Sequence, residues 1–200
     1  MRSPLLFLSL LLAGSIFAQG ERAWRDSLQA YWDRIETEYR DTVHSPLPVQ
    51  YRANFKNLER YAIDPAYRVT ALFTPEVGAA FPMRTSGTRT PSYRSVGTLS
   101  FPLGGVQRTL TVYQNIDLVK LPDYVNHLFV PFTDLTNGEA TYGGGRYLDL
   151  EGPLAKETEL DFNRAYNPYC AYGGAYSCPI PPQENHLEVA VEAGVKAFAH

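Results

Sequence analysis

The sequence predicts a mainly β fold, an antiparallel sandwich or barrel with an amphipathic helix at its N-terminus. Two observations indicate this. Over residues 21–39 the apolar side chains recur every three or four positions, which is the period of a helix. Beyond residue 48 they recur every second position, in short segments separated by glycine and proline, which is typical of β-strands joined by turns.

The size and charge of the chain favour one ordinary globular domain. It has 200 residues, a hydrophobic fraction of 44% and a formal net charge of -3, which is enough to build a single core. Its 18 basic and 21 acidic residues form no basic stripe, so nucleic acid is excluded as an expected partner. No motif for a metal or cofactor is present, and we expect neither.

The first 18 residues have the layout of a signal peptide. Arg2 precedes an apolar run from Leu5 to Leu12, and Ala18 offers a small residue for cleavage. The alternative is an uncleaved anchor, but the apolar run is shorter than the ~20 residues that a membrane-spanning helix needs. We therefore expect a secreted or periplasmic protein without a membrane span, with an N-terminal helix in residues 19–45 and one β-rich domain in residues 46–200.

The predicted helix carries an aromatic stripe, which we expect to pack on the protein's own core rather than on a ligand. Its apolar positions are Trp24, Leu28, Tyr31, Trp32, Ile35 and Tyr39. The helix ends before the Ser45-Pro46-Leu47-Pro48 stretch, because proline lacks the amide hydrogen and restricts the residue before it.

Alternation of apolar and polar side chains then predicts the strands. Residues 96–101 and 109–113 flank a Gly104-Gly105 turn and form a hairpin. The other predicted strands are residues 67–73, 127–132, 146–150, 159–163 and 187–195. Short strands of this kind point to a sandwich or barrel.

Two long motifs in the second half of the chain resemble a known family. They are Pro131-Phe132-x-Asp134 with Thr141-Tyr142-Gly-Gly-Gly-Arg146-Tyr147, and Asp161-Phe162-Asn163-Arg164-Ala165-Tyr166-Asn167-Pro168 with the Cys170 and Cys178-Pro179 pair. Over about residues 50–198 the sequence is similar to a bacterial and archaeal family known as domain of unknown function 1684. The resemblance implies no assigned activity.

Cys170 and Cys178 are separated by seven residues, which allows them to bridge. Outside the cytoplasm we expect a disulfide. A zinc site would need two further ligands, and the gap is wider than that of structural zinc pairs. A free catalytic thiol is the remaining alternative.

The polar residues of the two motifs have two possible roles. In one, they form a ligand-binding pocket in which guanidinium groups meet an external anion. In the other, they form a buried salt-bridge network that orders long loops. The residues concerned are Asp134, Glu139, Tyr142, Arg146, Asp161, Asn163, Arg164, Tyr166 and Glu184, with Tyr169 as a further aromatic wall. The glycine run before Arg146 favours a turn entering a strand over a phosphate cradle, because no Gly-Lys-Ser/Thr ending follows it.

Three functions remain open. The first is binding of a small polar or anionic ligand through this network. The second is an extracellular hydrolase in which Asp161 or Glu184 acts as general acid or base. The third is a structural envelope protein whose polar motifs only organise loops. The sequence contains no recognisable motif for a catalytic serine triad. The scattered histidines His44, His127 and His200 lack the spacing of a helical metal pair.

Overall fold

The computed structural model describes residues 5–199, with side chains from residue 18 onward. The predicted signal peptide lies almost wholly outside the residues whose side chains are described, so both it and the expected export remain predictions. Within the described part of the chain, no helix combines the length and the apolar character needed to cross a membrane.

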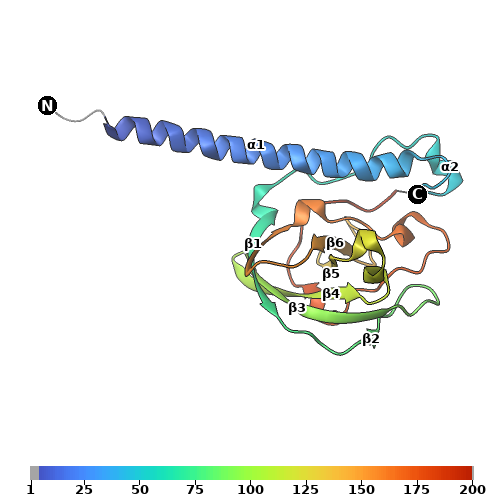
Figure 1. Cartoon of the computed structure of the whole chain (residues 1–200). Helices are drawn as coiled ribbons and strands as arrows, with labels where there is room; N and C mark the ends of the chain where they lie inside the picture. The colour runs from blue at the N-terminus through green and yellow to red at the C-terminus, as the bar shows by residue number, and fades with distance from the viewer. Residues whose placement is uncertain (1–4, 200) are drawn as a thin grey trace.

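The first helix, α1 (Leu5–Arg40), lies across one side of a strongly curved sheet (Figure 1). Its inward stripe is buried: Trp24, Leu28, Trp32 and Tyr39 are at most 4% exposed. They pack with Leu47, Leu58 and the C-terminal segment around Val195 in a second apolar cluster. The predicted docking of the helix on the protein's own core is therefore confirmed.

The rest of the chain forms a mainly antiparallel sheet that curls into a half-barrel. Its central order is β6-β5-β4-β3-β1-β7, while β2 pairs with β3, and β8 pairs in parallel with β5. The strands are β1 (Arg68–Pro75), β2 (Phe81–Pro82), β3 (Ser92–Leu103), β4 (Val106–Asn115), β5 (His127–Asp134), β6 (Arg146–Glu151), β7 (Glu157–Asp161) and β8 (His186–Leu187). The predicted fold class is thus confirmed.

Short helical turns join these strands. A one-turn helix, α2 (Val49–Arg52), follows α1. The 3-10 turns are η1 (Pro65–Tyr67), η2 (Leu118–Lys120), η3 (Pro122–Tyr124), η4 (Phe162–Arg164), η5 (Tyr169–Tyr172) and η6 (Gln183–Asn185).

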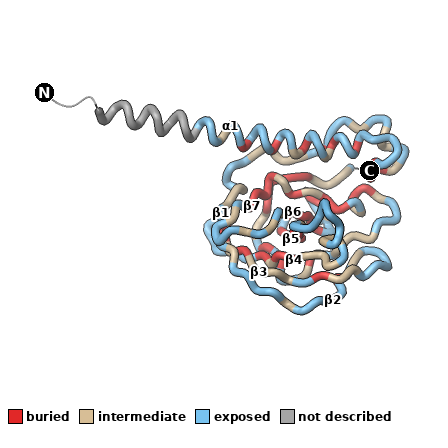
Figure 2. Tube along the Cα trace, in the orientation of Figure 1, coloured by how far each residue is buried: buried red, intermediate tan, exposed pale blue. Residues whose placement is uncertain are grey.

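The alternation of side chains gives the sheet two different faces. On β5, Leu128, Val130 and Phe132 point into the curl and join the main core with residues such as Phe101 and Leu160. Phe129 points outward and packs with Tyr93, Tyr113 and Tyr147 in an aromatic cluster. Figure 2 shows buried segments both inside the curl and along α1 where it lies over the sheet.

Two predicted strands are wrong in part. Of residues 187–195 only Leu187 lies in a strand, β8 (His186–Leu187), although Val191, Ala193 and Val195 are buried. Their carbonyl oxygens accept hydrogen bonds from Arg146 instead of from a neighbouring strand. The strand predicted to reach Asn163 ends at Asp161, because the Asp161 carboxylate accepts the Asn163 amide and the chain turns into η4.

Candidate functional site

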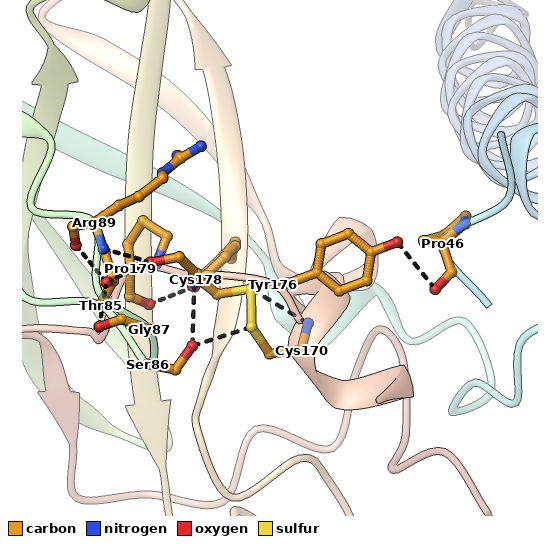
Figure 3. Close-up of a disulfide and its surroundings, with 11 residues drawn as sticks. Pro46, Thr85, Ser86, Gly87, Arg89, Cys170, Tyr176, Cys178 and Pro179 are labelled. Carbon is orange, nitrogen blue, oxygen red and sulfur yellow. Dashed lines mark hydrogen bonds between the residues drawn. A yellow bond between two sulfur atoms is a disulfide. The ribbon is translucent and has the colours of Figure 1, made fainter. Parts of the chain in front are cut away.

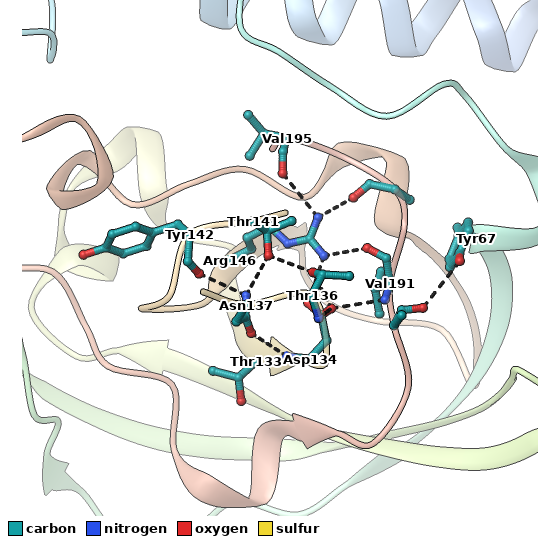
Figure 4. Close-up of polar contacts among 12 residues, drawn as sticks. Tyr67, Thr133, Asp134, Thr136, Asn137, Thr141, Tyr142, Arg146, Val191 and Val195 are labelled. Carbon is teal, nitrogen blue, oxygen red and sulfur yellow. Dashed lines mark hydrogen bonds and ion pairs between the residues drawn. The ribbon is translucent and has the colours of Figure 1, made fainter. Parts of the chain in front are cut away.

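Arg146 and Asp134 form a buried ion pair at the centre of the molecule (Figure 4). Both side chains are 0% exposed, and Nη2 of Arg146 lies 2.9 Å from Oδ2 of Asp134. The same guanidinium donates to the carbonyl oxygens of Val191, at 2.7 Å, and of Ala193 and Val195.

The other carboxylate oxygen of Asp134 is also occupied. It accepts hydrogen bonds from the amide and hydroxyl of Thr136, at 2.9 and 2.6 Å, and from the Val191 amide, at 3.1 Å. A charged pair so fully enclosed ties the C-terminal segment to β5 and β6, and it offers no surface to a ligand. For these two residues the geometry therefore supports the structural role.

The glycine run before Arg146 is a turn, as expected. Gly145 has a φ of +88°, and a β-carbon there would lie 2.6 Å from the carbonyl oxygen of Phe132 and 2.7 Å from Pro181. Only glycine allows this close approach. The turn delivers Arg146 into the core at the first position of β6.

Asp161, Asn163 and Arg164 hold α1 on the sheet. The indole of Trp24 donates to Asp161, at 2.8 Å, and the indole of Trp32 donates to the carbonyl oxygen of Asn163, at 3.2 Å.

Arg164 completes this attachment. Its guanidinium lies 3.6 Å from the Asp161 carboxylate and donates to Ser27 on α1, at 3.0 Å. Its carbonyl oxygen accepts from the hydroxyl of Tyr31, at 2.9 Å. We assign this group to docking of the helix.

Three other predicted site residues lie elsewhere. Glu139 is exposed in the turn after β5, and Tyr142 packs against the cluster beneath α1. Glu184 accepts the hydroxyl of Tyr113, at 2.7 Å. The structure thus distributes the predicted site over several places, and only Tyr166 and Tyr169 line the large hollow described next.

We call this hollow the tyrosine cleft. It has a volume of about 480 Å³ and lies between α1, the outer face of the sheet and the disulfide segment. The tyrosines that line it are Tyr31, Tyr39, Tyr93, Tyr124, Tyr147, Tyr166, Tyr169 and Tyr176. Its size falls within the range of small-molecule sites.

Most of these tyrosines already use their hydroxyl protons within the protein. Tyr31 donates to Arg164, Tyr147 to the carbonyl oxygen of Pro179, and Tyr166 to Asp149. Burial raises the pKa of Tyr31, Tyr147 and Tyr166 above its ordinary value, and the nearby Asp149 raises the pKa of Tyr166 further. The rings are therefore neutral at physiological pH and present mainly aromatic surface to the cleft.

Two guanidinium groups line the same cleft. Arg34 comes from α1 and lies over the ring of Tyr31, at 5.6 Å from its centroid, and Arg89 comes from the loop before β3. Both residues are exposed, and within the described part of the chain neither guanidinium has a carboxylate within ion-pair distance. They are cationic groups without a carboxylate partner among the described residues.

A histidine and a carboxylate form a third polar feature of the cleft. Nε2 of His127 lies 3.0 Å from Oδ1 of Asp149, and the hydroxyl of Tyr166 donates to Oδ2 of Asp149, at 2.8 Å. Nδ1 of His127 is buried and has no hydrogen-bond partner among the described residues. The arrangement fixes a histidine in the cleft wall with one ring nitrogen unused.

The predicted disulfide joins Cys170 to Cys178 (Figure 3), and Cys178 lies in one wall of the cleft. The Cα atoms of Cys170 and Cys178 are 6.3 Å apart. The amide of Cys178 donates to the hydroxyl of Ser86, at 3.1 Å. Ser177 exchanges a hydrogen bond with Thr85, at 2.7 Å, and accepts one from the amide of Arg89, at 3.2 Å. The bridged segment thereby positions the loop that carries Arg89.

Among the described residues, no group of three or more histidine, cysteine or acidic side chains is arranged to hold a metal ion. The two cysteines are joined to each other. Within this part of the chain, the disulfide is therefore supported over the zinc site and the free thiol.

The chain is a half-barrel crossed by an N-terminal helix, with an aromatic cleft between the two. The family model of the proteins of unknown function called DUF1684 matches residues 53–196. The chain belongs to this family, which confirms the resemblance seen in the sequence.

One solved structure supports the same placement. The solution NMR structure of an uncharacterised protein from gene locus rrnAC0354 of Haloarcula marismortui is 40% identical, with a TM-score of 0.70. The match covers 89% of this chain and 96% of that one. Among curated proteins, none matches the chain.

The cationic side chains of the cleft were not among the site residues predicted from the sequence, and its histidine, His127, was considered only as a possible metal ligand. Two signals were available. Arg34 lies three positions after Tyr31, a residue at one side of the apolar stripe, and this spacing places it at the edge of the docked face. His127 shares the outward parity of Phe129 on β5, whereas Leu128 and Val130 have the inward parity.

Proposed function

We propose that this protein is exported and binds a small ligand that combines an anionic group with a ring, in the tyrosine cleft. One observation carries the proposal: Arg34 and Arg89, two guanidinium groups without an internal carboxylate partner, line one aromatic cleft. Guanidinium groups recognise carboxylates and phosphates through paired hydrogen bonds. Aromatic walls add stacking area for a ring.

The disulfide supports the proposed export of the protein. It closes a loop of the second motif in the cleft wall, and hydrogen bonds from this loop hold the segment that carries Arg89. Such a bridge persists in oxidising compartments and is rare in the cytosol. The signal-peptide pattern of residues 1–18 points to the same compartment.

Thermal stabilisation by phenyl phosphate tests the binding. This probe carries a ring and a dianion, and inorganic phosphate serves as the probe without the ring. A ligand present at ten times its Kd raises the melting temperature of a chain of this size by about 3–5 °C. We expect this shift with phenyl phosphate and a smaller one with phosphate.

Three variants locate the binding. Arg34→Ala and Arg89→Ala should each remove most of the shift. The matched control is Arg94→Ala, whose guanidinium is bound to Gln114 outside the cleft, and it should keep the full shift. An equal shift in all three variants would refute binding at the two guanidinium groups.

A hydrolase is the second candidate, favoured by the His127–Asp149 pair in the cleft wall. A histidine held by a carboxylate is a suitable general base once its other ring nitrogen reaches the substrate, which for the buried Nδ1 of His127 requires movement of the side chain. The acid–base residues expected from the sequence lie elsewhere: Asp161 is engaged with Trp24, and Glu184 with Tyr113. Release of nitrophenolate from 4-nitrophenyl phosphate or acetate, lost in His127→Gln while the phenyl phosphate shift remains, would favour the enzyme. No turnover by the wild type would leave binding as the function of the cleft.

A further inference from the structure

A second hollow lies on the other face of β5 from the tyrosine cleft, and nothing in the proposed function uses it. It has a volume of about 750 Å³ and opens where the ends of β1 and β5 meet residues 152–156, the connection between β6 and β7. Leu128 contributes to this hollow, whereas His127 and Phe129, its neighbours on β5, line the tyrosine cleft. We call it the barrel-mouth pocket.

The floor of the pocket is apolar and continuous with the main core. Phe73, Val96, Leu128 and Leu154 line it and also pack in or against the core cluster. The Phe73 ring lies so close to Gly97 that a β-carbon there would be 2.5 Å from a ring atom. The glycine therefore lets an aromatic ring form part of the floor.

The rim of the pocket carries two exposed apolar side chains beside the polar residues Thr74, Gln114 and Asn126. Leu72 is 44% exposed and Val125 is 59% exposed, and both line the opening. Exposed apolar groups clustered around a hollow are typical of a binding site rather than of a solvated surface.

The charged residues in the lining indicate which kind of ligand fits the barrel-mouth pocket. Lys156 is the single charged residue in the pocket lining, and no acidic residue lines it. Lys156 is exposed, and in the described part of the chain its ammonium group has no carboxylate within ion-pair distance. An apolar hollow with one cation at its edge complements a molecule with an apolar body and one negative end.

We propose that the barrel-mouth pocket binds a single-chain aliphatic carboxylate, with the chain against Phe73, Val96 and Leu128 and the carboxylate beside Lys156. Open ends of β-barrels are frequent sites for small apolar ligands. This site is separate from the tyrosine cleft and does not depend on the function proposed there.

Calorimetric titration with dodecanoate, and with dodecan-1-ol as the uncharged analogue, tests this proposal. We expect the wild type to bind both. Leu72→Glu and Val125→Glu place a negative charge in the apolar rim and should each weaken both ligands by at least about tenfold. Val106→Glu is the matched control, because Val106 is 51% exposed and lies at the far end of the β3–β4 hairpin, and it should bind as the wild type does.

Lys156→Glu distinguishes the contribution of the ligand's carboxylate from that of its aliphatic chain. It should weaken dodecanoate by about threefold to tenfold, as expected for reversing one partly exposed charge, and leave dodecan-1-ol within about twofold of the wild type. The proposal is overturned if the wild type binds neither ligand, or if the rim variants and Val106→Glu behave alike. An equal effect of Lys156→Glu on both ligands overturns the placement of the carboxylate.

Two further measurements exclude other occupants. Size-exclusion chromatography of the wild type and Leu72→Glu should show the same oligomeric state, and dissociation of a wild-type dimer by the substitution would assign the surface to a second copy of the chain. Co-sedimentation with phosphatidylcholine vesicles should be absent. Vesicle binding that Leu72→Glu abolishes would assign the surface to a membrane instead.

Discussion

Arg146 shows how one side chain can resemble a ligand-binding residue and yet be structural. Nη1 and Nη2 of its guanidinium donate to Asp134 and to three carbonyl oxygens of the C-terminal segment, and Nε is buried without a hydrogen-bond partner among the described residues. In the sequence it appears as a cation after a glycine run, which is equally consistent with an anion site. The burial of the Arg146 side chain decides between the two roles. That burial depends on residues 191–195, which lie against the guanidinium.

Replacing this guanidinium should therefore destabilise the fold strongly. We expect Arg146→Met to lower the free energy of unfolding by about 3–5 kcal/mol, because it leaves the Asp134 carboxylate buried without its partner. Arg164→Met is the control: that side chain is 32% exposed, so its loss should cost about 1 kcal/mol or less. Denaturant unfolding measures both, and equal losses would contradict the buried role of Arg146.

The buried tyrosines predict a decline of stability at alkaline pH. Burial raises the pKa of Tyr172 to about 12, and it raises the pKa of Tyr39 and Tyr166 as well. In the unfolded chain a tyrosine ionises near ~10. The unfolded state therefore loses its protons first as the pH rises, so the stabilisation is complete below pH ~10 and is lost above it.

Denaturant unfolding at pH 8 and pH 11 measures this decline, with absorbance at 295 nm reporting tyrosinate. Tyr172 alone should contribute on the order of 1–2 kcal/mol to the difference at pH 11, since each pH step beyond the unfolded pKa is worth ~1.4 kcal/mol. Unchanged stability, or full ionisation of the tyrosines while the protein stays folded, would contradict their burial.

Among the elements, α1 is held to the sheet by two indole N–H groups whose acceptors differ in charge. Trp24 donates to the carboxylate of Asp161, and Trp32 donates to the carbonyl oxygen of Asn163. A hydrogen bond to a charged group is stronger than one to a neutral group. The two positions therefore form a matched pair for measuring how the helix is attached.

We expect Trp24→Phe to cost about 2–3 kcal/mol of unfolding free energy and Trp32→Phe about 1–2 kcal/mol, including the lost ring area. Each substitution keeps an aromatic ring and removes the indole donor. Chemical denaturation gives the two values. A larger loss for Trp32→Phe would show that the contact between Trp24 and Asp161 does not dominate the attachment.

The helix and most strands could be predicted because their side-chain periods are local. The aromatic stripe of residues 21–39 and the alternation in residues 127–132 both appear in the structure. The end of β7 at Asp161 and the irregular path of residues 187–195 could not be predicted. The first depends on a side chain capping the next turn, and the second on Arg146 taking carbonyl oxygens that a strand would use.

The candidate site was predictable only in part, for a similar reason. Tyr166 and Tyr169 belong to the second motif or follow it directly, and both line the cleft. Arg34, Arg89 and His127 come from a helix, a loop and a strand that meet only in three dimensions. The side-chain period within one element cannot predict which residues of other elements will lie beside it.

In the complete fold, the disulfide closes a short loop in the cleft wall, and hydrogen bonds from this loop hold residues 85–89. Closing a loop with a sequence separation of eight stabilises the chain by about 2.5 kcal/mol on the loop-entropy model. We expect the Cys170→Ala/Cys178→Ala double variant to lose about this much, and its Kd for phenyl phosphate to rise because the loop carrying Arg89 is released. Denaturation and calorimetry test the two effects, and an unchanged Kd would contradict the contribution of the bridge to the site.

Arg34 and Arg89 are proposed to make the tyrosine cleft a binding site for an anion that carries a ring. Titration of the isotope-labelled protein with phenyl phosphate, followed by NMR at the arginine side chains and the amides, locates this binding residue by residue. We expect saturable shifts at Arg34, Arg89, His127 and the segment around Tyr169, with Arg94 and Arg146 unmoved. Shifts centred on Arg94, or no saturable shifts at all, would contradict the claim.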